Sequence, residues 1–161
     1  MLQEFCDWLS ETPVSLTVQS VSWIIPTTQS IHILSIAVVM SCMVMFDLRM
    51  MRLVGRHHAI DVIGRRLLPP VWWALIALAL TGTVLIVGEP ARELTNVMFQ
   101  LKLVLIFVAI VITVVMQHKM RLEPLYWEKR RIAAVFLATV SLLVWVGILS
   151  AGRWIGYVQH G

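Results

Sequence analysis

The chain has 161 residues, of which 59% are hydrophobic, and a formal net charge of +4. Its mean hydropathy of +0.84 excludes an ordinary soluble domain. The patterns GxGxxG, GxSxG, HExxH and CxxC and the Walker loop are absent, which removes the commoner nucleotide-binding and hydrolase signatures. The loops between the apolar stretches are too short for a second domain. We therefore predict an all-α membrane protein with a single domain over residues 1–161.

The first 25 residues have the pattern of amphipathic helices. Leu2, Phe5 and Leu9 recur at helical spacing with polar residues between them. Thr12 and Pro13 fit an N-cap and the first helical position of a second short helix. We expect residues 1–25 to lie on the outer surface of the membrane as one or two amphipathic helices.

Four uninterrupted apolar stretches follow, at residues 31–46, 71–87, 97–116 and 132–150. A bilayer core of about 30 Å needs about 20 helical residues, so each stretch can span it once its flanks are added. We expect a four-helix bundle with spans at about 28–54, 70–87, 97–117 and 132–151. Pro69 and Pro70 are expected to open the second span, and Asn96 to cap the third. Thr27 or Thr28 is expected to cap the first.

Arginine and lysine residues cluster in the first and third loops of this arrangement. They are Arg49, Arg52, Arg56, Arg65 and Arg66, and then Lys119, Arg121, Lys129, Arg130 and Arg131. By the positive-inside rule these loops are cytoplasmic, so both termini lie on the periplasmic side of a bacterial inner membrane. Because the basic residues lie where membrane insertion needs them, we expect the lipid bilayer as partner and no nucleic acid.

Strictly inside the four apolar stretches lie one charged side chain, Lys102, and one histidine, His32. Ionisable groups at membrane depth are costly and therefore candidates for function. At 1.5 Å per residue, His32 lies about 7 Å and Lys102 about 9 Å below the outer boundary, so the two can face each other. A neutral imidazole ligates haem iron or copper, and a lysine amine that has lost its proton can ligate iron.

Each of these side chains also has a structural interpretation. His32 can hydrogen-bond a neighbouring helix, and Lys102 can extend to the outer interface and meet Glu89 or Glu93. Arg153 follows the fourth span on the same outer side. It can pair with a haem propionate, a lipid phosphate or Glu89.

The cytoplasmic side carries further candidates. His118 ends the third span about 24 Å below Lys102, so it cannot share a site with that lysine. It can form a separate metal site with His57 or His58, or remain a solvated interface residue. Asp47 lies at the inner end of the first span, where a carboxylate needs a partner.

We expect Asp47 to pair with Arg65 or Arg66.

The first span is also rich in sulfur, and its soft ligands are Met40, Cys42, Met43 and Met45. Thioether and thiol groups suit Cu(I), but methionine is also a flexible filler of helical cores.

Six segments carry a resemblance to a known family: 9–13 (LSETP), 30–34 (SIHIL), 46–49 (FDLR), 65–69 (RRLLP), 96–102 (NVMFQLK) and 152–157 (GRWIGY). Together they resemble an uncharacterised bacterial family of four-helix integral membrane proteins. The resemblance covers nearly the whole chain and implies the fold, but it implies no activity.

A fainter resemblance implies a cofactor. His32 early in the first span and Lys102-Leu103 opening the third are similar to the bacterial membrane protoporphyrinogen oxidase, a four-helix family that binds haem b. The matching histidine and lysine are essential in that family. The arrangement also looks like the copper-resistance D (CopD) membrane family. The tyrosine–histidine ending of the oxidase's third span is Gln117-His118 here, so the oxidase activity is not carried over.

These observations predict a haem b-binding protein that acts in electron transfer near the periplasmic face. His32 would be an axial ligand, Lys102 a second ligand or a propionate partner, and Arg153 a propionate partner. Membrane quinone or a periplasmic redox protein would exchange the electrons, and the thin bundle is compatible with a homo-oligomer. Any catalysis would be that of a haem-dependent membrane oxidoreductase or its subunit. The alternatives are copper handling by His32 with the sulfur atoms of the first span, and a cofactor-free anchor or scaffold subunit.

Overall fold

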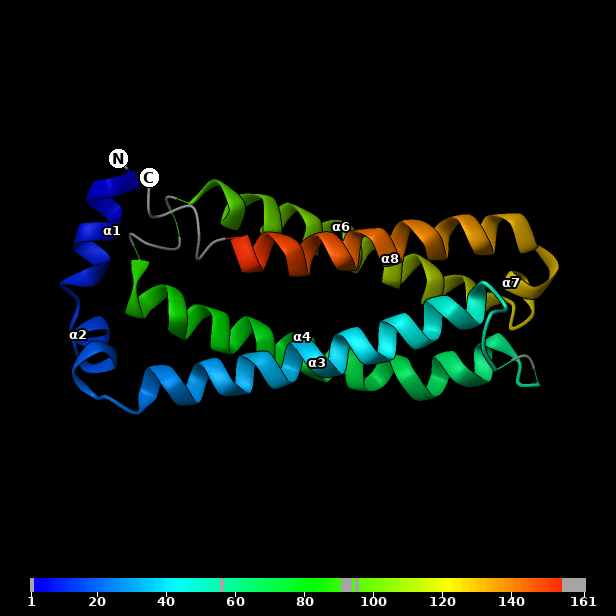
Figure 1. Cartoon of the computed structure of the whole chain (residues 1–161), viewed down its shortest axis with the longest axis horizontal. Helices are drawn as coiled ribbons and strands as arrows, with labels where there is room; N and C mark the ends of the chain where they lie inside the picture. The colour runs from blue at the N-terminus through cyan, green and yellow to red at the C-terminus, as the bar shows by residue number, and fades with distance from the viewer. Residues whose placement is uncertain (1, 56, 91–93, 95, 155–161) are drawn as a thin grey trace.

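The computed structural model describes residues 2–55, 57–90, 94 and 96–154 (Figure 1). Four long helices run side by side: α3 (Ile24–Met50), α4 (Ile60–Gly88), α6 (Val97–Leu122) and α8 (Arg131–Trp154). Each of the four is long and apolar enough to cross a membrane, which makes the chain a multi-pass membrane protein. The described residues contain no strand, and the predicted fold class, an all-α bundle of four spans, is confirmed.

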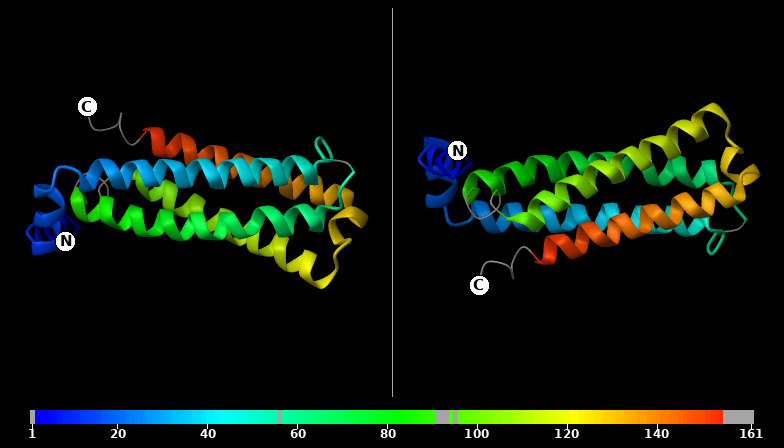
Figure 2. Two further views of the ribbon diagram at one scale, coloured as in Figure 1. Left: turned by 90° about the horizontal axis from the view of Figure 1, so that it is seen from below. Right: turned by 90° about the horizontal axis from the view of Figure 1, so that it is seen from above.

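Two short helices, α1 (Leu2–Ser10) and α2 (Pro13–Ser20), lie across one end of the bundle, and α7 (Tyr126–Lys129) lies at the other (Figure 2). The Ser15 hydroxyl donates to the Val87 carbonyl at 2.7 Å, which fastens α2 to the end of α4. Gly88 allows this close approach, because a Cβ atom there would lie 3.3 Å from Val18 Cγ1. The contact places α1 and α2 at the predicted outer end, and their position on a membrane surface remains a prediction.

Two predicted caps are confirmed. The Thr12 side chain accepts a hydrogen bond from the Ser15 N–H at 3.4 Å, and Pro13 is the first residue of α2. The Asn96 side chain accepts from the Met98 N–H at 2.9 Å at the start of α6. Both caps satisfy backbone N–H groups that have no partner inside the helix. Caps are local features, which is why the sequence alone locates them.

The predicted start of the first span is wrong. Helix α3 begins at Ile24, before both Thr27 and Thr28, and Trp23 occupies its N-cap position without a side-chain hydrogen bond. Pro26 is accommodated because it lies in the first turn, where its missing N–H would have no helical partner. The helix ends at Met50 rather than near residue 54.

The predicted start of the second span is also wrong. Helix α4 begins at Ile60, and Pro69 and Pro70 lie inside it rather than at its start. Ile60, Leu68 and Val71 are fully buried and hold this part of the helix against the bundle. The free energy gained by burying these side chains offsets the loss of two helical hydrogen bonds, because the prolines have no backbone N–H to donate. Helices α6 and α8 likewise exceed the predicted 97–117 and 132–151 by a few residues.

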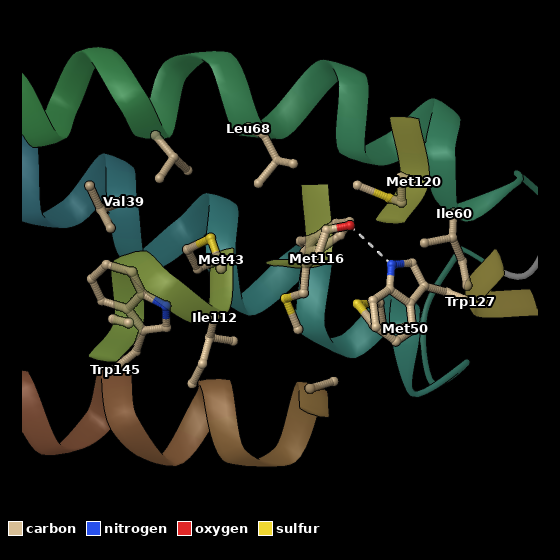
Figure 3. Packing of buried hydrophobic residues seen from close by; sticks show 14 of the residues in the cluster. Val39, Met43, Met50, Ile60, Leu68, Ile112, Met116, Met120, Trp127 and Trp145 are labelled. Carbon is tan, nitrogen blue, oxygen red and sulfur yellow. Dashed lines mark hydrogen bonds between the residues drawn. The ribbon is translucent and has the colours of Figure 1, made fainter. Parts of the chain in front are cut away.

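The core fills the half of the bundle nearest α7. Helix α3 packs along α4, α6 packs along α8, and α3 also contacts α8. Figure 3 shows apolar side chains from all four helices meeting there, and the Trp127 indole N–H donates to the Met116 carbonyl at 3.1 Å. Buried members of this cluster include Val39, Met43, Met50, Leu68, Ile112 and Trp145.

The other half of the bundle is more open. In Figure 1, α3 and α8 approach each other toward α7 and diverge toward α1 and α2. No residue of α4 between Ala74 and Gly88 is buried, and none of α6 between Phe99 and Ala109. The buried side chains of this half are few, and they include Ser35, Phe99, Ile148 and Ala151.

Substituting one core methionine tests the position of the core. We predict that Met43→Ala lowers the free energy of unfolding by about 2–5 kcal/mol, because Met43 is fully buried. Met45→Ala is the matched control, since Met45 lies on the same helix but is 47% exposed, and it should change stability by about 0.5 kcal/mol or less. Denaturant unfolding in detergent micelles measures both variants. Equal losses would contradict the core described here.

Candidate functional site

His32 of α3 faces α4, where it meets Thr81. The His32 Nδ1 atom lies 2.7 Å from Thr81 Oγ1, and the same hydroxyl donates to the Ala77 carbonyl at 2.7 Å. A hydroxyl has a single hydrogen, so when Ala77 receives it, the Thr81 oxygen accepts from Nδ1–H of the imidazole. This tautomer leaves the lone pair of Nε2 available to ligate a metal ion or to accept a hydrogen bond.

The backbone of α4 leaves room for the imidazole ring. Gly82 follows Thr81, and a Cβ atom at Gly82 would lie 3.7 Å from His32 Cε1, in van der Waals contact. The His32 side chain is half-buried. The expected hydrogen bond between His32 and a neighbouring helix is therefore present, and it orients the ring in the way that ligating histidines are commonly oriented.

Lys102 reaches the same region from α6. Its Nζ atom packs against Gly152 of α8, where a Cβ atom would lie 3.7 Å from Nζ and 3.8 Å from Cε. The charge of Lys102 lies within electrostatic reach of the His32 ring. The two ionisable side chains thus interact electrostatically from α3 and α6.

Arg153 follows Gly152 in the last turn of α8, and its side chain is exposed. It therefore belongs to the same end of the bundle as Lys102. Its predicted pairing with a propionate or a lipid phosphate remains a prediction. Glu93, one of the two expected partners of Lys102, lies outside the described residues.

His118 lies at the opposite end of the bundle, near the end of α6, and is exposed. His57 and His58 are exposed in the connection before α4. Over the described parts of the chain, no three His, Cys, Asp or Glu side chains are grouped so that they could hold a metal ion. His118 remains a candidate ligand by residue type alone.

The predicted pairing of Asp47 with Arg65 or Arg66 is wrong. Arg65 Nε lies 3.7 Å from Asp61 Oδ2, and Arg66 is exposed. Because α4 begins at Ile60, both arginines lie on its exposed surface rather than in a loop facing α3. Asp47 is fully buried, and neither of its carboxyl oxygens has a hydrogen-bond partner.

A polar junction near α7 was not predicted. Arg49 is 5% exposed, its Nε donates to the His58 carbonyl at 2.9 Å, and its guanidinium lies 3.9 Å from Glu128 Oε1. The same carboxylate oxygen accepts from the Ile60 N–H at 3.1 Å, at the start of α4. Glu128 therefore joins three segments that are distant in sequence. An acidic residue amid the basic third loop is the only sequence signal for this role.

Thr81 and Thr83 provide a matched test of the His32 contact. We predict that Thr81→Val lowers the free energy of unfolding by about 1–3 kcal/mol, because it leaves the His32 Nδ1–H without its acceptor. Thr83 is exposed and donates only to the Ala79 carbonyl of its own helix, so Thr83→Val should change stability by about 0.5 kcal/mol or less. Unfolding in detergent measures both. Indistinguishable variants would show that His32 does not depend on Thr81.

Comparison with known proteins places the chain in a family. No curated protein and no solved structure matches it. The model of a family of unknown function, DUF6644, matches residues 7–158, a range that includes all four spans. The match confirms the resemblance to an uncharacterised family of four-helix membrane proteins. The chain therefore belongs to DUF6644, a family of unknown function.

Proposed function

We propose that the protein binds haem b at the His32 end of the bundle and acts in electron transfer near the periplasmic face. The observation that carries the proposal is the His32 ring, which the Thr81 hydroxyl orients and which interacts electrostatically with Lys102 of α6. Haem supplies one-electron redox chemistry when bound. The chain supplies the axial imidazole, partial burial and nearby cations.

The donor atoms at this site suit haem better than a bare metal ion. The porphyrin provides four iron ligands, so the protein has to provide only axial ones. A structural or catalytic zinc site needs three or four protein ligands, and the described residues offer no such group. His32, with Nδ1 occupied by Thr81, presents Nε2 as the single imidazole ligand that haem requires.

The packing of the outer half also supports the proposal. Protein interiors are close-packed, and gaps between helices are few. Here no residue of α4 between Ala74 and Gly88 is buried, and none of α6 between Phe99 and Ala109. A flat apolar macrocycle beside these two stretches would bury more of their surface.

The cations at this end favour an anionic ligand. Lys102 and Arg153 both lie at the end of α8 that faces α1, and haem carries two propionates. Charge-assisted pairing of a propionate with either side chain would orient the ring. Lys102, if deprotonated, would instead be a second axial ligand.

The location follows from charge. The basic residues of the α3–α4 and α6–α8 connections favour a cytoplasmic position for both, which supports the proposed position of the His32 end near the periplasmic face of a bacterial inner membrane. Membrane quinone or a periplasmic redox protein would exchange electrons with a haem at this depth. Any catalysis would depend on the haem.

Copper handling has less support. The proposal for copper needs the sulfur atoms of α3 near His32, but Met43 is fully buried in the core, about 16 Å farther along the helix. Met40, the nearest of these residues, is still about 12 Å away along the axis.

A cofactor-free scaffold would tolerate His32→Leu and Lys102→Leu without loss of a bound group.

Absorption spectroscopy tests the haem proposal. We predict that the protein, purified after expression with added haem, shows a Soret band with bound iron, and that His32→Ala loses both. His118→Ala is the control, because His118 is exposed at the opposite end and its loss should leave the spectrum unchanged. A colourless wild-type protein would exclude haem. Copper without iron in elemental analysis would favour the copper alternative.

The Thr81 hydrogen bond generates a second spectroscopic prediction. Partners that orient a ligating histidine typically contribute a factor of 10–100 to metal affinity. Thr81→Val should therefore raise the haem dissociation constant by roughly 10- to 100-fold. Haem titration of the apoprotein measures the change, with Thr83→Val as control. Equal affinities would show that the Thr81 hydrogen bond does not contribute to haem binding.

A further inference from the structure

A second polar cluster lies inside the bundle, away from His32. It consists of Asp47 on α3 and of Ser141 and Trp145, one turn apart on the buried face of α8. The three residues are 0%, 1% and 3% exposed, respectively. Trp145 belongs to the core and is surrounded by apolar side chains (Figure 3).

None of the polar atoms in this cluster has a hydrogen bond. Both Asp47 carboxyl oxygens, Ser141 Oγ and Trp145 Nε1 are buried without a partner, although the Ser141 hydroxyl lies close enough to interact with Asp47. Native proteins contain few such groups, because each costs about 1–3 kcal/mol. Ser141 lies within reach of Asp47, and Trp145 lies one turn farther along α8.

No cation faces the Asp47 carboxyl from the described helices. Arg49, the nearest charge along α3, is directed to the His58 carbonyl and to Glu128. The buried residues of α4, α6 and α8 include no charged side chain. A permanent carboxylate would therefore be an uncompensated buried charge, which proteins avoid.

We propose that Asp47, Ser141 and Trp145 form a proton-binding site in the membrane interior. In the loaded state the Asp47 carboxyl carries the proton and is neutral. On release, its O–H bond breaks and the proton passes to water. The carboxylate that remains accepts hydrogen bonds from the Ser141 O–H and the Trp145 N–H.

The chemistry of the cluster selects a proton over a metal cation. Calcium and magnesium require at least six oxygen ligands, whereas this cluster offers one carboxyl and one hydroxyl. The indole N–H of Trp145 is a donor only and cannot ligate a cation. Asp47 lies about 22 Å along α3 from His32, so this inference does not rest on the haem proposal.

Infrared spectroscopy of the full chain in lipid tests the site. We expect a carboxylic acid carbonyl band in the wild type that shifts in D2O, disappears as the pH is raised, and is missing in Asp47→Asn. Asp61→Asn is the control, because Asp61 pairs with Arg65 on the surface of α4 and its loss should leave the band unchanged. A band that persists in Asp47→Asn would overturn the proposal. A wild-type band that remains at every pH at which the protein stays folded would also overturn the proposal.

Two further variants keep Asp47 and test the donors. Ser141→Ala and Trp145→Phe each remove one hydrogen bond to the carboxylate, so release of the proton should require a pH higher by roughly one to two units. An unchanged midpoint in both would overturn the assignment. These variants also decide the question if Asp47→Asn fails to fold, because each alters the band of Asp47 without removing it.

Discussion

A polar side chain inside a bilayer is separated from bulk water, so it is stable there only when a neighbouring helix provides a partner or when it is neutral. This constraint organises the bundle at three levels. At the end nearest α1, Thr81 of α4 holds the His32 ring. At the end nearest α7, Glu128 holds both Arg49 and the first turn of α4. Between them, Asp47 has no such match.

The two halves of the bundle differ in packing, and the difference follows from side-chain size and the course of the helices. Toward α7, large apolar side chains such as Phe46, Met116 and Trp127 fill the space between the helices. Toward α1, α3 and α8 diverge, and the glycines Gly82 and Gly152 leave room for the side chains of His32 and Lys102. One half thus stabilises the fold, while the other half presents ionisable groups in a less tightly packed region.

The sequence identifies His32 and Lys102 as candidate residues but not the contacts that hold them. His32 and Lys102 were identifiable because ionisable residues are rare inside apolar stretches. Thr81 was not, because a threonine in an apolar helix usually bonds to its own backbone, and only the packing of α3 on α4 brings it to His32. The sequence also draws attention to Asp47, but it predicts the wrong partner for it. The start of α4 places Arg65 and Arg66 on the surface, away from it.

The sequence by itself determined the number of spans, because membrane helices depend on the length and hydropathy of single segments. It also determined the caps at Thr12 and Asn96, whose hydrogen bonds are local. Only the tertiary structure decided that α4 continues through Pro69 and Pro70, since the buried residues on both sides of them make contacts that offset the lost hydrogen bonds. It alone also decided which polar side chains meet across helices, because those contacts join residues far apart in the chain.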